Sequence, residues 1–150
     1  MVPPSIVTLV LVSATVPPPI ALAPIRLLAT VVPFGGPSVR LLEITDSHTF
    51  HDQASQITAA LRMRSQLETS KTDWLCDSRT GVSKIDRAES KAWNSWAGAR
   101  LSPKTILGEG LMAAAAWQAV AAIDAAGPER GTLVSVVGCN QQAIGARFGV

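Results

Sequence analysis

The sequence predicts an α/β domain in which helices pack on the faces of a layered mixed sheet, because two hydrophobic patterns alternate along it. Residues 52–68 repeat apolar side chains at helical spacing, whereas Thr132–Val137 is a short β-branched run typical of a buried strand. Strands that alternate with helices imply crossovers covering a parallel or mixed sheet. With 150 residues, 47% of them hydrophobic, the chain is long enough to bury one core.

The first part of the chain differs in composition from the rest. Up to residue 39, Arg26 is the only charged residue, whereas acidic and basic residues crowd between residues 40 and 100. We therefore divide the sequence into an apolar, strand-rich segment of residues 1–45, irregular in part, and a main domain of residues 46–150. The strands expected in the first segment are residues 6–12, 25–32 and 39–44, which are rich in β-branched and other apolar residues.

The apolar N-terminus raises the alternative of a signal peptide or membrane anchor. No Lys or Arg precedes the apolar run, and its longest stretch without proline, residues 6–16, is too short to span a bilayer. The prolines at 17–19 would leave backbone groups unpaired at membrane depth. We therefore expect buried strands with a proline-rich connection.

Capping and turn residues set the order of elements in the main domain. Asp46 or Ser47 is the expected cap of the helix at 52–68, and Asp86 with Glu89 has the spacing of a capping box. An alanine-rich helix ends at Gly127 and Pro128. The remaining expectation is a strand at 73–76, a polar turn at 77–82, helices at 86–96 and 110–125 joined by a loop over 98–107, and strands at 132–137 and 143–148.

Charge and cysteine spacing argue against several function classes. A formal charge of +2 without a basic stripe does not favour nucleic-acid binding. Cys76 and Cys139 have no CxxC spacing, and the pair His48 and His51 lacks a third ligand, so we expect no metal and no other cofactor. Two free thiols are typical of a reducing compartment, which predicts a cytoplasmic protein.

Three segments carry a resemblance to a known family. Ser78–Glu89 contains a Thr-Gly pair followed by Asp and, three residues later, Glu. Lys104–Gln118 is Lys, three residues, Gly and Glu before an alanine-rich helix, and Val137–Asn140 is a glycine-containing turn before the last strand. In this order they resemble the histidine loop, the lysine–glycine–histidine segment and the glycine-rich loop of the β-ketoacyl synthases, the condensing enzymes of fatty-acid and polyketide synthesis. The resemblance implies a thiolase-like half-fold that corresponds to the C-terminal half of such an enzyme.

The resemblance also implies site residues. Ser78 and Glu109 stand where the family has two catalytic histidines, and Lys104 stands at the family's lysine. The residues expected to support these loops are Thr80, Gly81, Asp86, Glu89 and Gly108, and the expected substrate-binding positions are Gly138, Cys139 and Asn140. The family's histidines hydrogen-bond the thioester carbonyl, and such a donor is commonly worth a few kcal/mol. The family's nucleophilic cysteine lies in the N-terminal half, so the resemblance implies acyltransferase ancestry without turnover by this chain alone.

Each of these residues also has a purely structural interpretation. Glu109 at a helix start would contribute roughly 0.3–1 kcal/mol through the helix dipole, and its carboxylate is expected to form a salt bridge with Lys104. Lys104 would otherwise be a solvated loop cation, and Asp86 a helix cap.

By resemblance, the expected partner is an acyl carrier protein or a synthase subunit with the N-terminal half, and a homo- or hetero-dimer is left open. The alternative function is that of a non-catalytic, chain-length-factor-like subunit of a complete synthase.

Overall fold

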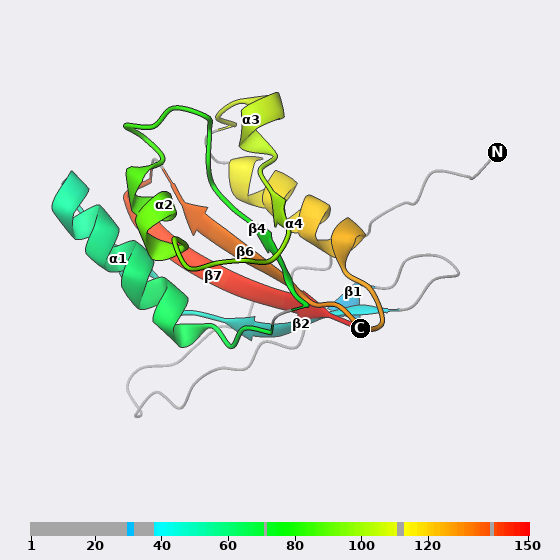
Figure 1. The fold of residues 1–150 in the computed structure, drawn as a ribbon. Helices are drawn as coiled ribbons and strands as arrows, with labels where there is room; N and C mark the ends of the chain where they lie inside the picture. The colour runs from blue at the N-terminus through cyan, green and yellow to red at the C-terminus, as the bar shows by residue number, and fades with distance from the viewer. Residues whose placement is uncertain (1–29, 32–37, 71, 111–112, 139) are drawn as a thin grey trace, which may run out of the picture.

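The computed structural model describes residues 30–31, 38–70, 72–110, 113–138 and 140–150. In this part of the chain seven strands form one mixed sheet, whose main path is β1-β2-β7-β6-β4-β5 with β3 paired to β7 beside it (Figure 1). The strands are β1 (Thr30–Val31), β2 (Val39–Ile44), β3 (His48–Thr49), β4 (Trp74–Cys76), β5 (Arg100–Leu101), β6 (Thr132–Val137) and β7 (Gln142–Gly149). The helices are α1 (Gln53–Gln66), α2 (Arg87–Ala92), α3 (Lys104–Leu107) and α4 (Ala114–Ala125).

Strand direction divides the sheet into two parts. β6, β4 and β5 run parallel, whereas β7 is antiparallel to both β6 and β2. The α/β class with a mixed sheet is therefore confirmed. The strand expected at 6–12 lies outside the described residues, and of the strand expected at 25–32 only Thr30–Val31 is described, as β1.

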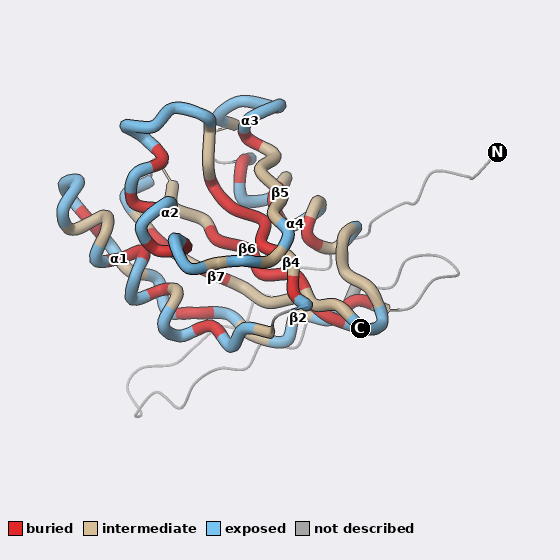
Figure 2. The backbone as a smooth tube through the Cα atoms, viewed as in Figure 1, coloured by how far each residue is buried: buried red, intermediate tan, exposed pale blue. Residues whose placement is uncertain are grey.

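Helices cover both faces of the sheet. Because side chains alternate along a strand, Leu133 of β6 packs with Met63 of α1 and with Trp93, which directly follows α2, whereas its neighbour Val134 packs with Ala122 of α4. The burial colouring follows this arrangement, with buried residues along β4 and β6 (Figure 2). Among the described residues, no helix is both long and apolar enough to cross a membrane.

Two expected helix boundaries are wrong. α2 ends at Ala92 instead of residue 96, and the carbonyl of Trp93 just beyond it accepts a hydrogen bond from the Arg100 guanidinium. α4 begins at Ala114 instead of residue 110. The segment 98–107, expected to be a loop, contains β5 and α3, which are too short to produce a periodic hydrophobic pattern.

Two expected caps are also wrong. The cap of α1 is Asp52, which forms a capping box with Ser55, and not Asp46 or Ser47. Asp86 occupies the cap position of α2 but makes no capping hydrogen bond, since its ψ of 1° is far from the extended conformation of a side-chain cap.

Candidate functional site

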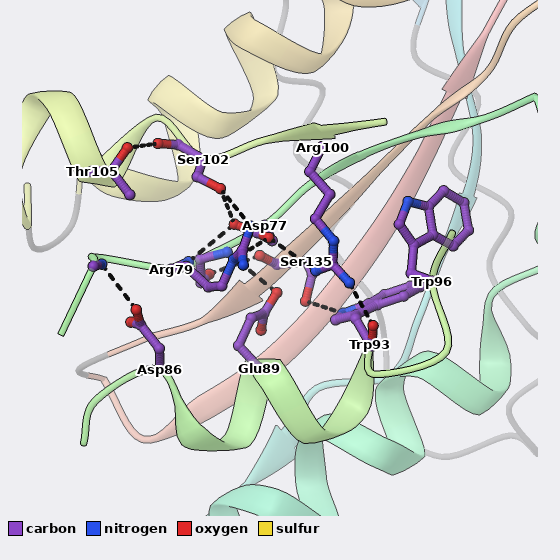
Figure 3. A network of polar contacts seen from close by, with 12 residues as sticks. Asp77, Arg79, Asp86, Glu89, Trp93, Trp96, Arg100, Ser102, Thr105 and Ser135 are labelled. Carbon is purple, nitrogen blue, oxygen red and sulfur yellow. Dashed lines mark hydrogen bonds and ion pairs between the residues drawn. The ribbon is translucent and has the colours of Figure 1, made fainter. Parts of the chain in front are cut away.

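A buried polar centre lies where β4 ends, and Asp77 is the residue at its middle. The Asp77 side chain is fully buried and accepts hydrogen bonds from the Arg79 Nε at 2.7 Å, the Arg100 Nη1 at 3.3 Å and the Ser102 hydroxyl at 2.7 Å (Figure 3). Two guanidinium groups and a hydroxyl compensate the loss of water around this carboxylate. The centre therefore joins the loop after β4 to β5 and the segment that leads into α3.

Ser78 comes next along the chain, and its hydroxyl is held by the backbone of β6. Its hydroxyl donates to the Ser135 carbonyl at 2.7 Å and accepts from the Val137 amide at 2.9 Å. The side-chain amide of Gln118, on α4, donates to the same Ser135 carbonyl at 2.9 Å. The Ser78 hydroxyl proton is thus engaged by the backbone of β6.

Glu89 projects from α2 toward Ser78 and is 2% exposed. One carboxyl oxygen accepts from the Ser78 amide at 3.2 Å, whereas the other is a buried oxygen without a hydrogen-bond partner in the described structure. Burial raises the pKa of this carboxyl to about 7, and the Asp77 carboxylate acts in the same direction. The Ser135 hydroxyl, the Ser78 amide and the charge of Lys104 oppose this rise in pKa. Glu89 therefore keeps its proton at pH values at which an exposed glutamate has lost it.

Lys104 and Glu109 form the expected salt bridge. The Lys104 ammonium donates to Glu109 Oε2 at 2.9 Å; the lysine is 2% exposed, whereas the Glu109 side chain is 35% exposed. The structural interpretation of Lys104 as a solvated loop cation is therefore wrong. Between the two residues Gly108 adopts a φ of +78°, which glycine tolerates without strain, and this turn brings the carboxylate back to the lysine.

Asp86 organises the loop that precedes α2. Its carboxylate accepts hydrogen bonds from the amide and hydroxyl of Thr80 at 2.8 and 2.9 Å and from the amide of Gly81 at 2.9 Å. Gly81 has a φ of +88°, which places its amide toward the carboxylate at a position where other residues would be strained. The supposed capping-box acid, Glu89, points instead to Ser78, so the two acids hold two different parts of the loop between β4 and α2.

The third segment forms the turn between β6 and β7. The Gly138 amide donates to the Gln142 carbonyl at 3.0 Å, and the Asn140 side-chain amide donates to the Gln142 side chain at 3.1 Å. Cys139 lies outside the described residues. The other cysteine, Cys76, is a buried free thiol whose pKa burial raises to about 12, so it remains protonated at neutral pH.

The structure joins the expected site residues in separate contacts. Ser78 and Glu89 are hydrogen-bonded, and so are Lys104 and Glu109, while Asp86 binds Thr80 in the same loop as Ser78. Sequence interpretation missed the residues that hold this centre together, namely Asp77, Arg100, Ser102, Gln118 and Ser135. The available signals were an acid directly after a buried strand and a glutamine within an alanine-rich helix.

The fold and the site define an α/β protein with a buried polar centre at the carboxyl end of a parallel strand pair. Among the described residues, no three His, Cys, Asp or Glu side chains gather in a way that could hold a metal ion. Comparisons with family models, curated proteins and solved structures find no match to this chain.

Proposed function

We propose that this chain is a β-ketoacyl-synthase-like C-terminal half with a thiolase-like half-fold, which does not catalyse condensation alone. The observation that carries the proposal is the convergence of the three motif segments on the end of β4. Ser78 contacts Glu89 of its own segment, Gln118 of the second segment and Val137 of the third. Gln118 and Val137, which lie 40 and 59 residues after Ser78 in the sequence, thus meet it at one place, as segments of one acyl-transfer site would have to.

Ser78 and Glu109, the residues at the family's two histidine positions, support the proposal that the chain alone does not turn over substrate. An oxyanion site requires donors aimed at the reacting oxygen. The Ser78 proton is already donated to the Ser135 carbonyl, and Glu109 is an acceptor that is paired with Lys104. Neither position offers a free donor to a thioester carbonyl, and a carboxylate would repel a developing enolate.

A second candidate, a chain-length-factor-like partner subunit of a complete synthase, is favoured by the outer face of α4. Ala115, Ala116 and Val120 are exposed on this helix, and its only charged residue is Asp124. A helix that exposes several apolar side chains and a single charge is typical of a surface that another protein covers. In both candidates the covering protein is a synthase subunit that carries a β-ketoacyl-synthase N-terminal half.

The experiment has two arms, of which the first measures activity. Purified chain is supplied with acetyl- and malonyl-acyl carrier protein, and carbon dioxide release and acyl transfer are measured. We expect no turnover. Turnover by the isolated chain would overturn the proposal that it lacks the donors and the nucleophile.

The second arm measures association. The chain is co-expressed with a synthase subunit encoded in an adjacent reading frame, and the complex is sized by light scattering. We expect a heterodimer that Val120→Glu abolishes and Val82→Glu leaves intact, because both valines are 51% exposed but only Val120 lies on α4. A subunit that carries only the missing half favours the first candidate, an intact synthase favours the second, and no association contradicts both.

A further inference from the structure

Charges are segregated by sign between residues 77 and 91. The three acids of this segment, Asp77, Asp86 and Glu89, are all buried. Its four cations are Arg79, which is partly exposed, and Lys84, Arg87 and Lys91, which are exposed. The surface of the segment is therefore cationic, although the formal charge of the whole chain is only +2.

Three of these cations line one cleft of about 510 Å³ between the loop after β4 and α2. Arg87 and Lys91 are one helical turn apart on α2, and Arg79 reaches the cleft from the loop. The hydroxyls of Ser83 and Ser90 also line it. Cations and hydroxyls that converge from two elements on one site suit a compact anion, because an excess of charges of one sign raises the local concentration of the opposite ion.

The carboxylate that lines the cleft offsets only one of these three positive charges. Asp86 is 8% exposed, and its oxygens are directed toward the loop, where they accept three hydrogen bonds from Thr80 and Gly81. Arg79 is also fixed in position, because its Nε donates to Asp77 at 2.7 Å. Asp77 is shared with Arg100, so this group of three side chains keeps a net positive charge. A pre-positioned guanidinium loses less conformational freedom when it binds an anion.

We propose that this cleft binds the phosphate or diphosphate group of a small ligand. Arg79, Arg87 and Lys91 supply charge-assisted hydrogen bonds to the phosphate oxygens, and the two serine hydroxyls supply neutral ones. The site is separate from the Lys104–Glu109 pair and does not depend on the proposed synthase ancestry. It is a ligand site that this chain carries on its own.

The test uses pyrophosphate as the probe and calorimetry at low salt, with amide chemical shifts to locate the site. The variant Arg87→Gln/Lys91→Gln removes two cleft cations, and the control Arg40→Gln/Arg62→Gln removes two exposed cations elsewhere, so both lose the same net charge. We expect the cleft variant to bind about tenfold more weakly and the control less than about twofold. Shifts are expected at residues 79–94.

Three results would overturn the proposal. The first is equal weakening in both double variants, which would mean that the probe responds to overall charge. The second is the absence of saturable binding at pyrophosphate concentrations up to about 10 mM. The third is a set of shifted amides that excludes residues 79–94. Thermal unfolding of each variant verifies that the fold is retained, and the single variant Arg87→Gln serves if the double variant does not fold.

Discussion

Replacement of Glu89 by glutamine tests whether its buried carboxyl makes the domain less stable as pH rises. Burial raises the pKa of this carboxyl from 4.5 to about 7, so between these values the native state holds more protons than the unfolded chain. The free energy of unfolding therefore falls as pH rises through this window. The stabilisation is complete below about pH 4.5 and is lost as pH passes 7. A pKa raised by one unit corresponds to about 1.4 kcal/mol, so the free energy of unfolding falls by about 3 kcal/mol across this window.

Glutamine removes the titration with little change of shape. Its carbonyl oxygen can still accept from the Ser78 amide, as Glu89 does at 3.2 Å, but the side chain has no ionised form. We expect the free energy of unfolding of Glu89→Gln, relative to the parent, to increase by about 3 kcal/mol between pH 4.5 and pH 8. The exposed acid Glu129 provides the control variant Glu129→Gln, whose difference from the parent should stay nearly constant.

Urea unfolding followed by tryptophan fluorescence at several pH values measures this difference. Trp93 is fully buried and follows Glu89 by four residues, just beyond the end of α2, so its share of the emission reports on the relevant core. A difference between Glu89→Gln and the parent that does not change from pH 4.5 to pH 8 would refute the reasoning, because it would mean that the native carboxyl titrates as it does in the unfolded chain.

Two further substitutions test charge pairing and packing. Glu109→Gln leaves the Lys104 ammonium buried without a carboxylate. It should lower the free energy of unfolding in urea by about 1 kcal/mol, a small value because Glu109 is 35% exposed. The additional change Lys104→Met should recover part of this loss, and an unchanged urea midpoint for Glu109→Gln would contradict the prediction. Gly145→Ala should destabilise by about 1–3 kcal/mol, because its methyl group would lie 2.7 Å from a Leu67 methyl carbon. The control is Gly127→Ala, whose added carbon meets only Arg130 at 3.9 Å, so the melting temperature should change little. Equal effects of Gly145→Ala and Gly127→Ala on the melting temperature would exclude overpacking as the cause.

The elements predictable from the sequence are those whose pattern is local. The expected strands at 39–44 and 132–137 coincide with β2 and β6, and the helix expected at 52–68 is α1 within two residues at each end. Their apolar or β-branched content, or their helical spacing, extends over six or more residues. β5 and α3 have only two and four residues. β5 is defined by its pairing with β4, and α3 is fixed by the burial of Lys104. Both are long-range features that a short stretch of sequence does not show.

The same distinction explains the candidate site. The Lys104–Glu109 pair joins residues five apart across a glycine turn and could be expected from the sequence. Two of the three side-chain partners of Asp77, by contrast, are Arg100 and Ser102, which lie 23 and 25 residues further along the chain. They reach Asp77 only because β5 pairs with β4. Burial of Lys104 is likewise a property of the assembled fold, and charge alone suggested a solvated residue.

Glu89 differs from the other buried ionisable groups in how its charge is compensated. Asp73 is paired with Arg147, Asp77 with two guanidinium groups and Lys104 with a carboxylate. Glu89 has one backbone amide, and its second oxygen is unpartnered in the described structure. A buried acid with so little compensation is most stable when protonated. A rise in pH through neutrality therefore places a new negative charge beside Asp77, at the point where the three motif segments meet.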